Sequence, residues 1–337
     1  MLTRFHKILI AVLAVQIVLA LVMLTRGNDT AALRSHPVLA GFVPADVTRL
    51  QVFAAADKPA VDLVKRDGHW VIASSFDYPV DAARIDEVTA ALGKMAAAAP
   101  IATQAARHAQ LKVADTEFER KLVITAGGKD VTLYVGGAAG MQRNAVRLAG
   151  DDRVYAVSGV SAFSLPAEAR SWALPEYVKV ARDDIASVTI EHGATIAKLD
   201  KAADKWNVTL DGAPIALAKG ETLDDQTIGR LADSASTLRL SAPADPKRDT
   251  SAKVATITIE KKASGTSSAA PIVIDVLADP AGYYVHQRAL DHAAIVDKPD
   301  LDEVVGVARD KIVKPPPPPT TPPAGAGSGS AVPRPLH

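Results

Sequence analysis

The stretch LVKRDGHWVIASSFDYPVDAARIDEVTAAL, residues 63–92, decides the fold of this chain. Its first part alternates apolar and polar residues around Asp67-Gly68, a dipeptide that is typical of a two-residue hairpin turn. Its second part begins at Asp81, a residue type that caps helices. Apolar residues then recur on one helical face, at Ile85, Val88, Leu92 and Met95. The stretch therefore predicts a tryptophan-bearing hairpin followed by an aspartate-capped helix.

A second copy of the pattern lies further along the chain. The segment KAADKWNV, residues 201–208, keeps the tryptophan but has neither the histidine nor the Asp-Gly turn of the first copy. In residues 221–238, Asp224 stands at the capping position, and the same apolar spacing follows at Ile228, Leu231, Ala235 and Leu238. Because the two copies share only the strand and its aromatic residue, we interpret Trp70 and Trp206 as core anchors of two related modules.

Each module continues with further strands. Residues 120–136 and 144–158 predict two hairpins in the first module, and residues 255–277 and 282–297 predict two in the second. A short closing helix is expected over 161–173 and over 299–313. The predicted order is therefore β-β-β-α-β-β-β-β-α, twice. Short connections between neighbouring strands favour antiparallel sheets, so the predicted fold class is α+β.

The N-terminal residues predict a membrane anchor. The 17 residues Ile8–Leu24 are apolar except for Gln16, and as a helix they would span about 26 Å, near the minimum for crossing a bilayer. Arg4 and Lys7 outnumber Arg26, so we expect the N-terminus in the cytoplasm and the rest of the chain outside it. We expect an uncleaved single-pass anchor in a bacterial inner membrane. A cleaved signal peptide and a buried soluble helix are the alternatives.

The predicted organisation has five parts. Residues 1–27 form the signal anchor, 28–42 a linker, 43–180 the first α+β repeat and 181–313 the second, and 314–337 a disordered tail rich in Pro, Gly and Ser. The five consecutive prolines from Pro315 favour polyproline II, which has no internal hydrogen bonds. The tail is expected to be a spacer, with a ligand for an aromatic groove as the alternative.

Composition excludes several classes of function. Lys plus Arg equals Asp plus Glu at 38 each, so there is no basic surplus of the kind that nucleic-acid-binding proteins carry. The chain has no cysteine, which excludes disulfides, thiol catalysis and cysteine metal sites. Hydrophobic residues make up 48 %, enough for folded cores.

No motif in the sequence predicts a reaction. His69 next to Trp70 is expected to face solvent, and the eight histidines show no HExxH spacing. The carboxylate pairs stand at predicted turns or helix starts, at Asp151-Asp152, Asp183-Asp184 and Asp224-Asp225. The glycine-rich stretch 136–144 lacks the ending of a phosphate loop and is interpreted as a mobile connection, and Ser161 has no Gly-x-Ser-x-Gly context. We therefore predict no catalytic, cofactor-binding or metal residue and no enzymatic activity.

The segments VTRLQV (47–52), LVKRDGHWVI (63–72) and DYPVDAARIDEVTAAL (77–92) resemble a family of bacterial proteins, the domain of unknown function 4340. The matching positions are Gly68, Trp70 and Asp81, and the resemblance covers most of residues 1–310. It implies an inner-membrane anchor, a bulk outside the cytoplasm, and genes beside ABC-type export components, including those likened to gliding-motility transporters. It implies no catalytic residue. The alanine-rich second half of the first helix and the proline tail depart from the family pattern.

Three functions remain open from the sequence. The first is a non-enzymatic single-pass protein that contacts the bilayer through residues 8–24, binds other envelope or transporter proteins, and serves as an accessory or scaffold of an ABC-type export or envelope complex. The second is a glycan- or peptide-binding module, which an exposed surface of Trp172, Tyr177 or Tyr283-Tyr284 would favour. The third is a cell-wall hydrolase, which needs a cleft with two carboxylates within about 10 Å. We expect the first.

Overall fold

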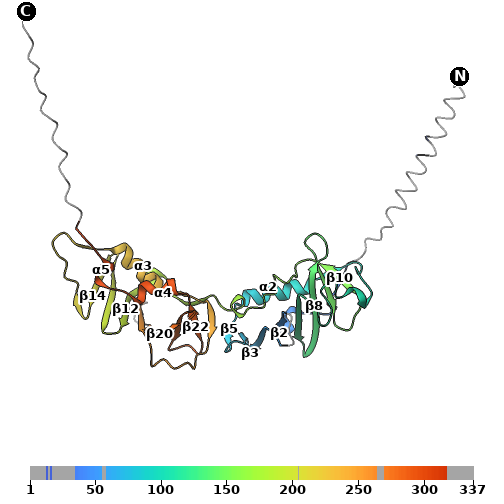
Figure 1. Cartoon of the computed structure of the whole chain (residues 1–337), viewed down its shortest axis with the longest axis horizontal. Helices are drawn as coiled ribbons and strands as arrows, with labels where there is room; N and C mark the ends of the chain where they lie inside the picture. Colours follow the sequence, from blue (N-terminus) through green and yellow to red (C-terminus); the bar gives the residue numbers. More distant parts are fainter. Residues whose placement is uncertain are drawn as a thin grey trace, which may run out of the picture. The chain divides into compact units, whose positions relative to one another are not determined.

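The computed structural model describes residues 13, 16, 35–54, 58–203, 205–263 and 269–316. In these residues the protein is a mixed α+β fold dominated by two large antiparallel sheets with few helices (Figure 1). It forms two compact units, one mainly from residues up to Pro175 and the other mainly from Glu176 onward. The predicted anchor over residues 8–24, apart from Leu13 and Gln16, and the tail from residue 317 lie outside the described part. Within the described part, no helix combines the length and apolar character that a membrane span requires.

The first unit is built on an eight-stranded sheet. Its strand order is β10-β9-β8-β7-β2-β3-β4-β5. In chain order the strands are β2 (Val47–Phe53), β3 (Val61–Arg66), β4 (His69–Ile72), β5 (Tyr78–Pro79), β7 (Arg120–Ala126), β8 (Lys129–Ala138), β9 (Asn144–Leu148) and β10 (Val154–Val157). A separate two-stranded pair joins β1 (His36–Pro37) to β6 (Ala96–Ala97). The predicted hairpins over 120–136 and 144–158 are confirmed, with Gly127-Gly128 at the turn of the first.

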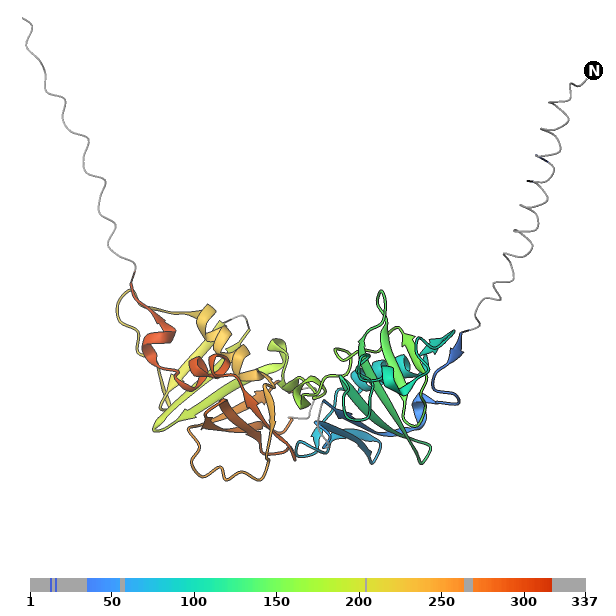
Figure 2. The same cartoon turned by 45° about the vertical axis from the view of Figure 1, so that its right-hand side comes forward.

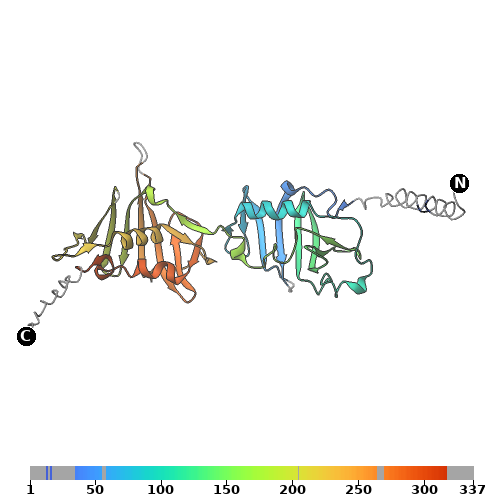
Figure 3. The same cartoon turned by 90° about the horizontal axis from the view of Figure 1, so that it is seen from above.

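Helix α2 (Ala82–Gly93) lies across one face of this sheet (Figure 3). Its start is fixed by the Asp81 side chain, which accepts a hydrogen bond from the Ala83 amide at 3.1 Å. Such a cap satisfies one of the free amides of the first helical turn. The predicted apolar face is confirmed, because its four members are at most 4 % exposed: Ile85, Val88, Leu92 and Met95. Burial of this face holds the helix to the sheet.

The second unit is built on a nine-stranded sheet of order β15-β14-β13-β12-β19-β20-β21-β22-β18. In chain order the strands are β12 (Ile185–His192), β13 (Thr195–Ala202), β14 (Lys205–Leu210), β15 (Ala213–Pro214), β18 (Ala242–Ala244), β19 (Ala255–Lys261), β20 (Ile272–Asp279), β21 (Gly282–Gln287) and β22 (Ala293–Val296). Short pairs join β11 (Glu176–Lys179) to β17 (Thr237–Arg239) and β16 (Thr222–Leu223) to β23 (Val313–Lys314). Helix α3 (Asp225–Ser236) is capped by Asp224 and contacts α4 (Lys298–Val305); α5 is Arg309–Ile312 (Figure 2).

The two sheets are connected in the same order. In each, four strands run outward to one edge, a capped helix follows, and the chain returns to pair with the first strand, as β2 with β7 and β12 with β19. Three further strands then run to the other side. The predicted face of α3 is also buried, with Ile228, Leu231, Ala235 and Leu238 at most 2 % exposed.

Both expected closing helices differ from the prediction. Residues 161–173 contain only a 3-10 turn, Ala169–Ser171, because Pro166 disfavours a helix before it and the Trp172 indole donates to the Pro166 carbonyl at 2.8 Å. The second helix is present but is divided into α4 and α5 around Gly306.

The glycine-rich stretch 136–144 is part strand and part turn, so its interpretation as a connection holds for residues 139–143 and not for the two glycines before them. Gly136 and Gly137 lie inside β8, and only residues 139–143 form the turn to β9. Residues 111–113 lie directly against Gly136: a Cβ at this position would stand 2.0 Å from the Leu111 carbonyl oxygen and 2.8 Å from that of Lys112. A glycine is therefore required here by close approach of another backbone segment.

The two module tryptophans differ in burial. Trp206 is 6 % exposed and belongs to the core of the second unit, as predicted. Trp70 is only half-buried, although it lies on the same face of β4 as the fully buried Ile72, because β4 is covered on its outer side only by the two-residue edge strand β5. Trp172, which no repeat argument singled out, is the fully buried tryptophan of the first unit.

We predict that Gly136→Ala destabilises the first unit by about 1–3 kcal/mol, since the added methyl group displaces a packed backbone. Gly137→Ala is the matched control, because its Cβ would meet only the Glu119 carboxylate at 3.5 Å. Hydrogen exchange of the β7–β9 peptides in a urea series gives the two stabilities. Equal midpoints for both variants would contradict the close contact at Gly136.

The Asp224 cap of α3 predicts that the stability of the second unit decreases at acidic pH. The Lys314 ammonium, 2.9 Å from the Asp224 carboxylate, and the Thr227 amide and hydroxyl lower the pKa of Asp224 to about 2. A depressed pKa stabilises the native state above the unfolded value, about 3.9, and this contribution is lost as the pH falls toward 2.

Asp224→Asn keeps a capping oxygen but loses the charge. We expect its urea midpoint to lie below the wild-type value at pH 6, and the difference to shrink as the pH falls from about 4 to 2. The readout is tryptophan fluorescence fitted as two transitions. Asp225→Asn, at the exposed neighbouring position, should follow the wild type at each pH. A pH-independent deficit in Asp224→Asn would refute the ionic contribution.

Candidate functional site

A hollow of the first unit lies between its sheet and the segment that precedes β2. We call residues 36–43 the strap. The strap begins with β1, which pairs with β6, and the Val38 amide donates to the Met95 carbonyl at 2.9 Å. Val38 and Leu39 are each 7 % exposed. The strap is therefore a packed part of the first unit, although it falls mostly in the range that the sequence assigns to a linker, 28–42.

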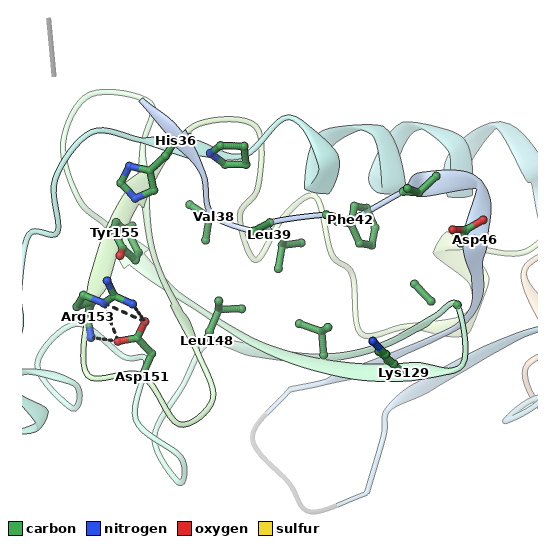
Figure 4. Close-up of a pocket in the computed structure, with 17 residues that line it drawn as sticks. His36, Val38, Leu39, Phe42, Asp46, Lys129, Leu148, Asp151, Arg153 and Tyr155 are labelled. Carbon is green, nitrogen blue, oxygen red and sulfur yellow. Dashed lines mark hydrogen bonds and ion pairs between the residues drawn. The ribbon is translucent and has the colours of Figure 1, made fainter. Parts of the chain in front are cut away.

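A tight turn redirects the strap toward β2. The Phe42 amide donates to the Leu39 carbonyl at 3.3 Å, and Gly41 adopts a φ of +73°, which a side chain would disfavour. Beyond the turn, Pro44 meets the end of α2, where a Cβ on Gly93 would stand 3.2 Å from the proline ring. These contacts hold the strap over the sheet and leave a groove beneath it (Figure 4).

The groove has a volume of about 780 Å³ and an apolar middle. Its floor comes from successive strands, with Val131 from β8, Leu148 from β9 and Tyr155 from β10. Val38, Leu39 and Phe42 of the strap line it from the other side (Figure 4). A groove of this volume with an apolar lining in its middle suits an apolar segment.

Charged side chains mark the two ends of the groove. At one end, Arg153 Nη2 lies 2.8 Å from Asp151 Oδ2 and Arg153 Nε lies 3.0 Å from Asp151 Oδ1, next to the His36 ring, which stands edge-on to Tyr155 with 5.7 Å between centroids. Lys129 and Asp46 lie at the other end (Figure 4). The side-chain and backbone hydrogen bonds from Arg153 lower the pKa of Asp151, so this carboxylate stays ionised and is not suited to act as a general acid.

A buried arginine positions the turn that carries Asp151. Arg147 is 3 % exposed and donates from Nε to the Val113 carbonyl at 2.7 Å and from Nη1 to the Asp151 carbonyl at 3.3 Å. Its Nη2 is paired with Asp115, and its guanidinium stacks on the Tyr134 ring at 4.5 Å. Arg147 thus joins the 108–115 segment to the β9–β10 turn and fixes one end of the groove.

The other residues singled out in the sequence lie apart from one another. His69 is exposed on β4. The carboxylate pairs act locally: Asp183 binds Lys201 at 3.1 Å, and Asp224 caps α3. Ser161 exchanges hydrogen bonds with Ser164 in a turn. Among the described residues, no group of three or more histidine, aspartate or glutamate side chains is placed to hold a metal ion.

The groove was missed in the sequence because its two walls are far apart in the chain. The one available signal is the apolar spacing of HPVLAGF, residues 36–42, between the anchor and the first strand. Nothing local indicates that Lys129 and Arg153 meet that segment.

The family model for a domain of unknown function, DUF4340, matches residues 70–261, more than half of the chain. The chain belongs to this family. No curated protein and no solved structure shows significant similarity to it. The DUF4340 match includes the floor of the groove on β8–β10 and begins after the strap. It confirms the resemblance inferred from Trp70 and the capped helix.

We predict that Arg147→Met destabilises the first unit by about 1–3 kcal/mol, because the buried carbonyl of Val113 loses its donor. Arg153→Met is the matched control: the Arg153 side chain is 59 % exposed, and loss of a surface ion pair should leave stability nearly unchanged. Urea titration with tryptophan fluorescence compares the two. If both variants unfolded at the same urea concentration, the structural role assigned to Arg147 would be wrong.

Proposed function

We propose that this chain is a non-enzymatic single-pass membrane protein whose part outside the cytoplasm binds other proteins. The bacterial inner membrane is its location, with the N-terminus in the cytoplasm. Its role is that of an accessory or scaffold component of an ABC-type export or envelope complex. The observation that carries the proposal is the groove under the strap, because only about ten residues separate the strap from the predicted anchor.

The occupant of the groove is an extended segment of a membrane-embedded partner protein. The groove offers apolar contacts in its middle and both signs of charge at its ends, with Lys129 and Asp46 at one end and Arg153 and Asp151 at the other. Such an arrangement recognises a short apolar run flanked by polar residues. The ten or so residues between anchor and strap keep the groove within about 37 Å of the bilayer, where such a partner is found.

Four observations support the rest of the proposal. The apolar run Ile8–Leu24 and the preceding Arg4 and Lys7 support the anchor and its orientation. The shared strand order of the two sheets supports a tandem pair of related modules. The proline-rich tail supports a disordered spacer, and the family resemblance supports the ABC-type partner.

The alternatives gain less support. A glycan-binding platform from Trp172, Tyr177 or Tyr283-Tyr284 requires exposed rings, and these four side chains are at most 9 % exposed. A hydrolase requires a carboxyl that can donate a proton, and Asp151 of the groove is instead held ionised by Arg153. A peptide-binding role is close to the proposal and differs only in the nature of the occupant.

Site-specific crosslinking tests the proposal, since a chain without cysteine allows one unique thiol at a time. A benzophenone placed at Lys129→Cys, at the groove, should yield a discrete adduct with an envelope or transporter protein in native membranes. The same probe at Lys65→Cys, exposed on β3 and outside the groove lining, is the control and should not. Mass spectrometry identifies the adduct.

A groove-filling variant makes the test specific. Leu148→Trp places a large ring on the half-buried floor and should abolish the adduct at position 129 while the chain stays folded, as checked by thermal denaturation. An adduct that persists in Leu148→Trp, or no protein adduct at position 129, would refute the groove as the binding site.

A further inference from the structure

Two apolar side chains of the first unit stand almost entirely in solvent. Met141 is 91 % exposed and Phe163 is 93 % exposed. The other large apolar side chains exposed in the described residues range only from 43 to 56 %. Single exposed apolar residues are ordinary on protein surfaces, but exposure of a whole phenylalanine or methionine is unfavourable in water.

Both side chains leave the same end of the first sheet. Met141 lies in the turn that enters β9 at Asn144, and Phe163 lies in the loop that follows the end of β10 at Val157. In the antiparallel register of these strands, Val157 pairs directly with Asn144. The turns that line the groove, at Gly127 and Asp151, are at the opposite end of the same strands.

The loop that carries Phe163 is firmly held. Ser161 and Ser164 exchange hydrogen bonds, with the Ser161 amide 2.9 Å from Ser164 Oγ and the Ser164 amide 3.2 Å from Ser161 Oγ. Arg84 donates to the Ser164 carbonyl at 3.2 Å, and Leu165 next to it is 1 % exposed. The ring is thus presented on a fixed turn, which lowers the entropic cost of placing it in a binding partner.

The Met141 turn is similarly closed and carries a cation. The Ala139 amide donates to the Arg143 carbonyl at 2.8 Å, and the Arg143 amide donates to the Gly140 carbonyl at 3.4 Å. Arg143 is exposed, and no ion pair with a carboxylate of the described residues engages it. A cation beside an apolar tip suits an anionic lipid surface, where the guanidinium meets phosphate while the side chain beside it enters the apolar layer.

We infer that Met141 and Phe163 insert into the interface of the bilayer that holds the anchor, with Arg143 at the level of the lipid phosphates. Each apolar side chain stands alone on a narrow turn among glycine, serine and glutamine, rather than at the centre of an apolar patch of the kind that binds proteins. The inference rests on the anchor of the proposed function. Tethering keeps these turns near lipid, so weak insertion of two side chains is enough.

Fluorescence quenching in proteoliposomes tests the inference on the full chain. An environment-sensitive fluorophore is attached at Ala162→Cys, next to the intact Phe163, and the chain is reconstituted in phosphatidylethanolamine and phosphatidylglycerol with or without brominated acyl chains. We expect blue-shifted emission and bromine quenching several-fold above that of the same probe at Lys65→Cys, a site at the opposite end of the sheet. Phe163→Ser together with Met141→Ser should reduce quenching at position 162 to the control level.

Three other results would overturn the inference. They differ in what they mean for the proposed function. Quenching equal to the control, in a chain that resists alkaline extraction, refutes insertion and leaves the anchor intact. A blue shift without bromine quenching refutes insertion and assigns the turns to a contact with protein, from this chain or a second copy of it. Release of the chain by alkaline extraction removes the anchor, and with it both this inference and the membrane part of the proposed function.

Discussion

The pairing of β2 with β7 is the constraint on which the first unit depends. In the sequence these two strands are separated by four strands, β3 to β6, and helix α2. They nevertheless lie side by side at the centre of the sheet, with Leu50 opposite Ile124 and both fully buried. The pairing brings the chain back to β2 after helix α2. It also fixes the register of the strands that follow, β8, β9 and β10. The second unit repeats it, with Val188 opposite Ile259 in β12 and β19. Because a one-residue slip would turn each buried face to solvent, this register is strongly determined.

Register also determines where the functional features lie. The β7–β8 and β9–β10 turns emerge at one end of the sheet, and the strap closes over that end to form the groove. The β8–β9 turn and the loop after β10 emerge at the other end and carry Met141 and Phe163. The strands between the two ends are only four to ten residues long, so a rise of about 3.3 Å per residue separates the ends by a few tens of ångströms.

The sequence predicts those parts of the fold that depend on residues close together in the chain. The capped helices and the hairpins were found because a cap, an apolar face and a turn dipeptide each lie within a few residues. The strap, the burial of Arg147 and the need for Gly136 were not found, because each depends on segments that approach only in the folded chain. Gly136 shows this clearly: its sequence context reads as a loop, and the contact that explains it comes from Leu111. The predicted closing helix of the first unit is absent for a local reason, because Pro166 in the middle of residues 161–173 disfavours a helical conformation in the residues before it.

Binding of a partner in the groove and insertion of Met141 and Phe163 into the bilayer take place at opposite ends of the same sheet. The length of the sheet therefore limits how both can occur together. If the Met141 and Phe163 turns rest on the bilayer, the groove faces away from it by roughly one strand length, about 15–30 Å. The residues between Leu24 and His36 can span this distance when extended, at about 3.4 Å each. The occupant of the groove would then be a segment that projects from the membrane surface rather than one buried in it. This geometry favours a loop outside the cytoplasm, on a membrane-embedded partner, over a transmembrane helix as the segment that the strap holds.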